Sequence, residues 1–369
     1  MYLIIKIPIM KQDINRFALF LLLLPFLWVA CDKDNDDNPE PVDPPEAVIW
    51  QPVPGMESIG ALNLEIIDGD LLAMTKSFLF RVDEQTSAFE NYYLGNFTAG
   101  YATMINERFL VKMENSWIFV FNTQNPDELF GFDIKDHFPD FGDFFFPPAV
   151  LGDVIVSNDE DVFLTVYRRK EDGITIAEPQ LLLFRAELDA QGKVSVHDIM
   201  VSSIDEGYIF GDLIGIHSTG QDFIISLIGG TFKVDPQGNW YQVSENRMYN
   251  FIEYGDKLLS FVNDDLFVSY DNGDTWESIS TLPYGLLAWQ QKGFVWEDEI
   301  LIWDAYRITR MRISNDALHL QSYCTEGLDP APGRYLTRMA AGSENMYVAT
   351  QKGLFYKPLQ DFRESQIIP

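Results

Sequence analysis

Short apolar runs, separated by Gly, Asp and Asn, recur along the chain from Glu46 onward. In seven places an acidic or polar turn residue is followed by a strand-like run of apolar residues. These runs start at Asp70, Glu107, Asp161, Asp222, Asp256, Glu299 and Asn345. Each is followed by a further apolar run, such as residues 117–121 or 353–356, and then by a turn and another strand. Short strands at this spacing predict an all-β repeat protein.

One turn is more informative than the others. Ser269, Asp271, Gly273, Thr275 and Trp276 form the pattern S-x-D-x-G-x-T-W between two strand-like segments. The Asn-Gly-Asp sequence tolerates the left-handed backbone of a tight hairpin. This pattern resembles the Asp-box (BNR) hairpin of sialidase-like and sortilin-like β-propellers. The resemblance implies that the Asp and hydroxyl side chains bond the turn backbone and that the Trp packs between neighbouring blades.

The Asp-box resemblance and the seven repeats together predict a seven-bladed β-propeller with four strands in each blade. Six or eight blades are the alternatives, because the third unit is long. Asp235 and Trp240 have the same spacing as Asp271 and Trp276, so residues 235–240 look like a decayed second copy of the turn.

The last repeat unit, residues 334–358, supplies only three strands. Residues 50–53 follow the pattern of residues 240–243 and 276–279, where a Trp begins an outer strand. We therefore expect a strand near the N-terminus to complete the last blade. Such a strand closes the ring and covers an open sheet edge.

The first thirty residues are typical of a targeting segment. Lys11 and Arg16 precede an apolar run, residues 17–30, and Cys31 follows Ala30. A basic region followed by a short apolar run predicts a signal peptide. The Ala30-Cys31 pair resembles a bacterial lipobox, which implies that Cys31 carries a lipid. Trp28 stands where Leu is usual, so a plain secretory signal is the alternative, and translation starts at Met1 or Met10.

Residues 31–45 are acidic and rich in proline. Such a composition cannot bury apolar surface and predicts an extended, solvated tether. An acidic stretch directly after the lipobox cysteine also resembles the surface-export signal of Bacteroidota lipoproteins. We therefore expect a lipid-anchored protein at the outer membrane or cell surface, with residues 46–369 as the propeller.

Charge excludes one class of partner. The formal net charge is −30, and removal of residues 1–30 takes away three basic residues and one acidic residue, which leaves −32. An acidic surface repels phosphate backbones, so nucleic acid is not expected as a partner. Only Cys31 and Cys324 are present, and lipidation of the first would leave no disulfide partner for the second.

Catalytic and metal motifs are missing from the sequence. The four histidines, His137, His197, His217 and His319, have no metal-binding spacing. The chain has no G-x-S-x-G elbow and no Gly-rich phosphate loop. We therefore expect neither a cofactor nor a metal, and the pattern favours a protein that is not an enzyme. Paired carboxylates for glycoside hydrolysis stay possible among 56 acidic residues.

Insertions favour one face of the ring. The four strands of a blade are called a to d, from the axis outward. The a–b and c–d turns lie on one face of the ring, which we call the turn face. The b–c loops and the d–a connections between blades lie on the opposite face, which we call the connection face. The long segments that we assign to the connection face are residues 135–148, 168–180, 200–208, 281–291 and 324–334. Long insertions on one face of a repeat array indicate its binding face.

Aromatic and basic residues in these segments are the candidate binding residues. They are Phe138, Phe141, Phe144, Phe145, Phe146, Tyr284 and Trp289, with Arg168 and Arg169 as a basic pair. The phenylalanines form either an exposed apolar platform or a small satellite core, and the basic residues would receive a carboxylate or sulfate.

These patterns predict a binding module for a glycan, peptide or envelope protein. The alternatives are a glycan hydrolase or lyase with its site over the central channel, and a structural subunit of an outer-membrane complex.

Overall fold

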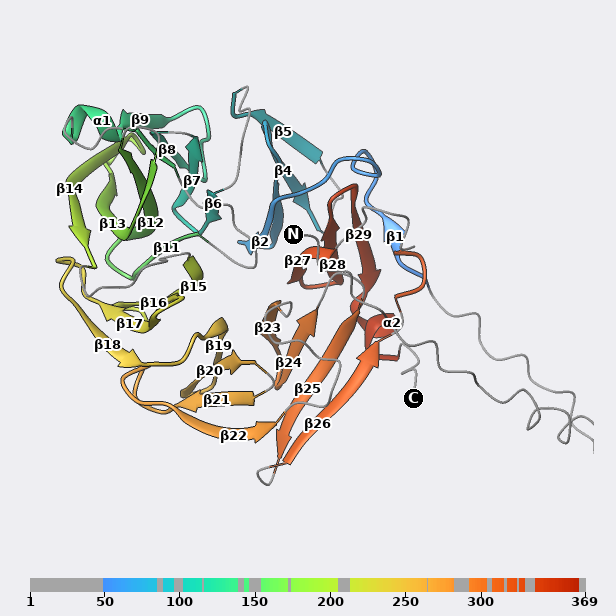
Figure 1. The fold of residues 1–369 in the computed structure, drawn as a ribbon. Helices are drawn as coiled ribbons and strands as arrows, with labels where there is room; N and C mark the ends of the chain where they lie inside the picture. The colour runs from blue at the N-terminus through green and yellow to red at the C-terminus, as the bar shows by residue number, and fades with distance from the viewer. Residues whose placement is uncertain are drawn as a thin grey trace, which may run out of the picture. The chain divides into compact units, whose positions relative to one another are not determined.

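The fold is a ring of seven antiparallel sheets, each a blade of a β-propeller (Figure 1). The computed structural model describes residues 49–84, 89–95, 102–114, 116–138, 143–145, 154–171, 174–204, 213–263, 265–281, 292–303, 307–314, 317–323, 325–328 and 336–364. The signal segment, the tether and Cys31 lie outside these residues. The prediction of seven blades with four strands each is confirmed.

The blades follow one another in chain order. Blade 1 contains β2 (Asn63–Ile67), β3 (Asp70–Met74), β4 (Phe78–Asp83) and β5 (Phe89–Tyr93). Blade 2 contains β6 (Ala102–Ile105), β7 (Phe109–Glu114), β8 (Trp117–Asn122) and β9 (Leu129–Asp133), and α1 (Ile134–His137) follows it. Blade 3 contains β11 (Ile155–Ser157), β12 (Val162–Glu171), β13 (Ile174–Leu188) and β14 (Val194–Ser203), with β10 (Asp143–Phe145) added.

The second half of the ring has the same order. Blade 4 contains β15 (Leu213–Ser218), β16 (Phe223–Leu227), β17 (Gly230–Val234) and β18 (Trp240–Ser244). Blade 5 contains β19 (Tyr249–Tyr254), β20 (Lys257–Val262), β21 (Asp265–Ser269) and β22 (Glu277–Thr281). Blade 6 contains β23 (Lys292–Trp296), β24 (Glu299–Trp303), β25 (Ile308–Ser314) and β26 (Ala317–Tyr323). Blade 7 contains β27 (Leu336–Ala341), β28 (Asn345–Thr350), β29 (Gly353–Pro358) and β1 (Gln51–Pro52).

The second strand of every blade coincides with one of the seven runs found in the sequence. These strands are nearly continuous in burial: β16 and β24, for example, are buried along their whole length. Each sits between two neighbouring blades, so both of its faces are covered and its apolar run is unbroken. The first a–b turn uses Asp68 and Gly69 with φ of 54° and 85°, the left-handed backbone of a tight hairpin.

The hydrophobic core is divided among the junctions between blades. Six clusters of buried residues each join two successive blades; Leu64, Leu71 and Ala349, for example, belong to the cluster between blades 1 and 7. Packed apolar side chains of the described residues therefore connect the blades at six of the seven junctions, all except the one between blades 4 and 5, at the close packing density of protein interiors. Among the described residues, no helix is long and apolar enough to cross a membrane.

The ring closes without a covalent bond. Strand β1 pairs with β29, with Gln51 opposite Tyr356 and Pro52 opposite Phe355, although the two strands lie at opposite ends of the chain (Figure 1). Val53 N donates to Leu354 O at 2.8 Å, and Trp50 is 1% exposed. The prediction of an N-terminal strand that completes the last blade is confirmed. Strand β1 has two residues, whereas the sequence pattern runs over four, residues 50–53.

A short C-terminal helix, α2 (Leu359–Glu364), was not foreseen. Its Phe362 is fully buried. The centroid of the Phe362 ring lies 5.8 Å from that of Trp50, 5.4 Å from that of Trp296 and 4.3 Å from that of Tyr323. Phe362 therefore joins the closing segment to blade 6. Aromatic groups packed in this way contribute beyond the area that they bury.

Candidate functional site

The turn from Ser269 to Trp276 has hydrogen bonds of the kind that its resemblance to the Asp-box implies. The Asp271 carboxylate accepts hydrogen bonds from Thr275 N at 2.8 Å and from Thr275 Oγ1 at 2.6 Å, and Gly273 N donates to Ser269 Oγ at 2.8 Å. Gly273 has a φ of 88°, and a Cβ built there would lie 2.1 Å from Ile224 Cδ1 of blade 4. The turn therefore packs the c–d hairpin of blade 5 closely against blade 4.

The predicted second copy of this turn behaves in the same way. The Asp235 carboxylate accepts hydrogen bonds from Gln237 N at 2.9 Å and Asn239 N at 2.8 Å, and Trp240 Nε1 donates to Ser203 O of blade 3 at 3.1 Å. The sequence analysis missed a third copy, in which Asp189 accepts from Gln191 N and Lys193 N at 2.8 and 2.9 Å. It lacks the Trp, since Val194 stands there.

Two of the predicted binding segments meet in the structure. Strand β10 pairs with the outer part of β12, with Phe144 opposite Arg169 and Phe145 opposite Arg168. The phenylalanine-rich segment and the basic pair therefore belong to one sheet, although 22 or more residues separate them in the chain. Phe138 is half-buried and packs against the core between blades 2 and 3. Phe141, Phe146, Tyr284 and Trp289 lie outside the described residues.

Blade 3 is longer than the others on the connection face. Strand β13 has 15 residues and β12 has 10, whereas the other b and c strands have five to seven. Four extra residues extend a strand by about 13 Å. The b–c loop of a blade lies on the connection face, so β10, β12 and β13 form a three-stranded extension there. We call it the blade 3 extension.

The central channel holds a second group of polar residues, which the sequence analysis did not single out. A cavity of about 100 Å³ is lined by innermost strands of blades 3 to 7, and its polar residues are His217, Asn250, Lys292 and Arg338. Lys292 Nζ donates to Thr337 O at 3.4 Å, and His217 Nε2 lies 3.1 Å from Glu253 Oε1. Lys292 is the first residue of its strand, and Asn250 and Arg338 are the second and third of theirs, so they lie nearer to the connection face.

The channel shifts the acid–base properties of its residues. Burial lowers the pKa of Lys292 to about 8 and that of Arg338 to about 10, and the charge of Glu65 opposes part of the second shift. Desolvation raises the pKa of Glu65 to about 7, against the attraction of Arg338. The hydrogen bond with His217 holds the pKa of Glu253 below its usual range. Desolvation disfavours charged forms and is the largest cause for Lys292, Arg338 and Glu65, although Lys292 and Arg338 are half-buried and Glu65 is exposed by their accessible area.

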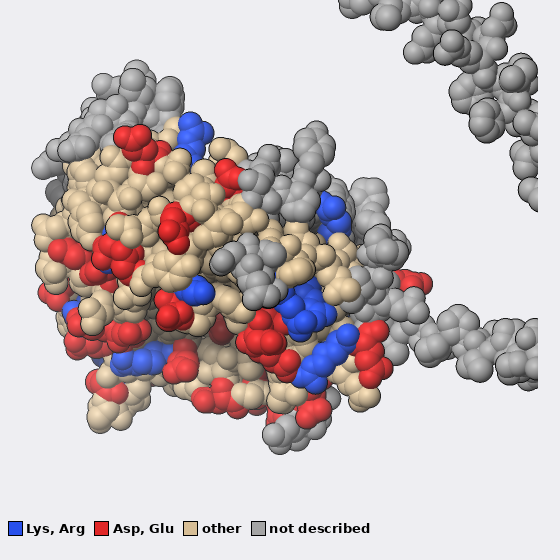
Figure 2. All heavy atoms as spheres, turned by 90° about the horizontal axis from the view of Figure 1, so that it is seen from below, with Lys and Arg blue, Asp and Glu red and all other residues tan. Residues whose placement is uncertain are grey.

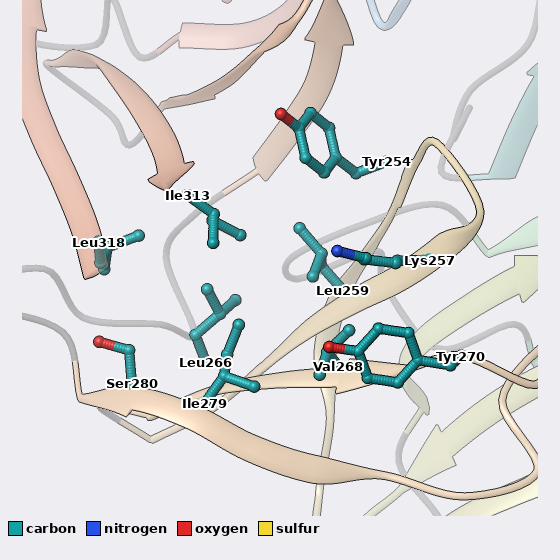
Figure 3. A pocket seen from close by; sticks show the side chains of 10 residues that line it. All are labelled: Tyr254, Lys257, Leu259, Leu266, Val268, Tyr270, Ile279, Ser280, Ile313 and Leu318. Atoms are coloured by element: carbon teal, nitrogen blue, oxygen red, sulfur yellow. The ribbon is translucent and has the colours of Figure 1, made fainter. Parts of the chain in front are cut away.

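A third feature is a small crevice between blades 5 and 6 (Figure 3). Its volume is about 70 Å³, and Lys257 lies beside the rings of Tyr254 and Tyr270 above apolar side chains. Lys257 Nζ is 5.4 Å from the Tyr270 ring centroid, and Tyr254 donates to Asp298 O at 3.1 Å. Both tyrosines adjoin turns on the turn face, so this crevice is separate from the channel cavity.

The outer surface agrees with the acidic composition. Figure 2 shows Asp and Glu side chains spread over the visible face and Lys and Arg in small, separate groups. Among the described residues, no group of three His, Cys, Asp or Glu side chains could hold a metal ion.

Comparison with known proteins shows the fold. No protein-family model matches the sequence, and no curated protein matches it. The extracellular domain of BT4673 from B. thetaiotaomicron superposes with a TM-score of 0.52 at 12% identity, over 84% of this chain and 40% of that one. PorZ, an essential surface component of the type-IX secretion system of Porphyromonas gingivalis, superposes with a TM-score of 0.50 at 12% identity, over 87% of this chain and 39% of that one.

A chain of the mitotic checkpoint complex gives a TM-score of 0.54 at 11% identity, over 89% of this chain and 98% of that one. The chain thus spans about 40% of the two bacterial proteins. At these identities the likeness shows a shared architecture: this chain is a seven-bladed β-propeller, with structural neighbours from Bacteroidota.

Proposed function

We propose that this chain is a surface-anchored binding module that holds a glycan, peptide or protein partner on its connection face. The observation that carries the proposal is the blade 3 extension, which lengthens one blade on the face where the long connections lie. The other six blades pack with b and c strands of five to seven residues, so the ring does not require the added length. Insertions of this kind on a repeat scaffold commonly bind partners.

The extension also combines two chemistries. Its paired strands place Phe144 opposite Arg169 and Phe145 opposite Arg168, so each aromatic residue is the cross-strand neighbour of a basic residue. Aromatic and Arg residues carry much of the energy at protein interfaces. Arg also binds carboxylate or sulfate groups through paired hydrogen bonds. In a chain of net charge −30, a basic pair here favours an acidic or partly acidic partner.

The anchoring part of the proposal rests on the N-terminal sequence. Cys31 would carry the lipid and residues 32–45 would keep the propeller away from the membrane. The structural neighbours from Bacteroidota are an extracellular domain and a surface component, which supports a cell-surface location.

Replacing the lipid-bearing residue is expected to release the protein from the membrane. A Cys31→Ser variant should lose lipid labelling and move from the membrane fraction to the periplasm or medium, because a signal peptide without the acceptor thiol cannot be lipidated. The measurement is fractionation of cells together with metabolic labelling by a fatty acid. A Cys324→Ser variant is the matched control and should stay with the membrane. A Cys31→Ser protein that remains membrane-bound would show that the lipobox interpretation is wrong.

Removing the aromatic residues of the blade 3 extension is expected to weaken partner binding. The triple variant Phe144→Ser, Phe145→Ser, Phe146→Ser should fold as the parent does and recover less partner from cell envelopes and glycan arrays. Truncation of residues that carry interface energy typically costs about 2 kcal/mol or more. Tyr270→Ser, which removes a 56%-exposed ring beside a c–d turn on the opposite face, is the control and should bind normally.

The stability of the triple variant separates the interpretations. A melting temperature several degrees lower would show that the phenylalanines form a satellite core, and normal folding with unchanged binding would remove the platform. Glycan turnover abolished by one acidic substitution would establish the enzyme alternative, for which the perturbed pKa values in the channel are the supporting observation.

A further inference from the structure

The channel cavity has an unusual balance of charge for this chain. The whole sequence has 56 acidic and 26 basic residues, yet the cavity is lined by Lys292, Arg338 and His217. The acidic groups around them are Glu65, which interacts with Arg338, and Glu253, which is hydrogen-bonded to His217. Lys292 and Arg338 therefore place positive charge on the cavity wall, and each of the two acidic groups already interacts with one basic residue.

Hydrogen-bond donors are also left for a ligand. The Nδ2 atom of Asn250 is buried and has no hydrogen-bond partner among the described residues, although a buried donor without a partner costs free energy. Among the residues that the structure describes, Lys292 Nζ makes one long hydrogen bond, to Thr337 O. An ammonium group has three protons to donate, so Lys292 can donate further hydrogen bonds to a ligand. Asn250 and Lys292 both line the cavity, so donors and positive charge coincide there.

Lys292, which is half-buried and partly desolvated, lowers the stability of the protein. Its pKa of about 8 in the folded protein lies below the ordinary 10.5. The unfolded chain therefore binds the proton more tightly, and the penalty is fully present below about pH 8 and fades as the pH rises toward 10.5. An anion bound beside the ammonium group would offset this penalty. A local feature that opposes folding is commonly kept for function.

We propose that the channel cavity binds the carboxylate group of a singly charged acid through Lys292, with Asn250 and Arg338 as further donors. This inference rests on the proposed function and names the chemistry of its ligand. A cavity of about 100 Å³ holds a group of few atoms, since about 150 Å³ accepts benzene. Glu65 beside Arg338 and Glu253 beside His217 oppose a second negative charge, which favours a singly charged carboxylate over a doubly charged phosphate. The carboxylate is that of a free small acid or the end group of a larger ligand that reaches in from the connection face.

Titration calorimetry on the purified chain with acetate tests the proposal. Acetate should bind, and Lys292→Met should weaken binding at least about tenfold while raising the melting temperature at neutral pH. Affinity should fall between pH 7 and 9 as Lys292 loses its proton, and Lys292→Met should keep only the dependence near pH 7 that ionisation of Glu65 beside Arg338 produces. Lys257→Met, a lysine outside the channel, should bind as the parent does. Absence of carboxylate binding, or binding unchanged in Lys292→Met, overturns the proposal.

A second variant keeps the test decisive if Lys292→Met does not fold. Asn250→Asp keeps the size and the tolerance for the left-handed φ of 51° but places a negative charge on the cavity wall. It should abolish acetate binding, and normal binding would contradict the proposal. Tighter binding of sulfate or inorganic phosphate than of acetate would also contradict it.

The source of the carboxylate follows from a comparison of ligands. An oligosaccharide that ends in glucuronate and a peptide with a free C-terminus should bind more tightly than acetate if the group belongs to a larger ligand, and no more tightly if it is a free acid. The blade 3 extension is measured separately. Loss of partner recovery in its triple variant without any carboxylate binding would refute the channel inference alone.

Discussion

Deletion of residues 46–54 is expected to destabilise the whole propeller by several kcal/mol and to increase aggregation. The deletion removes Trp50 and Val53, which are 1% and 4% exposed, together with both paired residues of β1. Loss of a buried Trp side chain alone typically costs about 3–5 kcal/mol. The deletion also leaves the outer edge of β29 uncovered, and an unpaired strand edge is a template for association with another chain.

A deletion of the neighbouring tether provides the control. Removal of residues 32–45 should leave the melting temperature nearly unchanged, because an acidic, proline-rich segment contributes little apolar burial. Thermal unfolding followed by circular dichroism, with light scattering for aggregation, compares the two proteins. Equal melting temperatures would show that the N-terminal strand does not stabilise the ring.

The blades could be predicted because each carries a local signal. A second strand with both faces covered needs an unbroken apolar run, and a polar residue must precede it at the a–b turn, so the same short pattern returns seven times. The closing strand was predictable for a related reason: residues 50–53 repeat the Trp-led pattern of the outer strands. Only the length differed, since β1 covers two of those four residues.

The blade 3 extension could not be predicted as one unit. Residues 143–145 have no strand pattern of their own, and their pairing with Arg168, Arg169 and Lys170 depends on where the connection between blades 2 and 3 returns. Sequence reasoning identified both segments as candidates but treated them as separate. Pairing between segments far apart in the chain is set by the fold, and local pattern does not encode it.

The channel residues were missed for a different reason. Glu65 and Arg338 are charged residues within otherwise apolar innermost strands, Leu64-Glu65-Ile66 and Arg338-Met339-Ala340, and this was the available signal. The polar channel residues come from blades 1, 4, 5, 6 and 7, so the cluster exists only after the ring closes. The turn motif at Ser269–Trp276 was easier to recognise, because all of its residues lie within one hairpin.

The last prediction concerns the C-terminal helix. Phe362→Ala is expected to destabilise the propeller by about 3–5 kcal/mol, the usual cost of truncating a buried aromatic residue. Phe362 is fully buried among Trp50, Trp296 and Tyr323, so its loss leaves a cavity where the closing segment meets blade 6. Phe362→Ala and the deletion of residues 46–54 remove parts of one cluster. The loss of stability in a protein that carries both changes should therefore be smaller than the sum of the two separate losses.

Chemical denaturation of the parent, of Phe362→Ala and of Phe362→Leu measures this effect. The Leu variant keeps most of the apolar volume and should lose much less stability, which separates cavity formation from a general effect of substitution. Leu359→Ala removes a partly buried neighbour in the same helix and serves as the matched control, with a smaller loss expected. If Phe362→Ala unfolds at the same denaturant concentration as the parent, α2 does not hold the closing segment, and the pairing of β1 with β29 alone must close the ring.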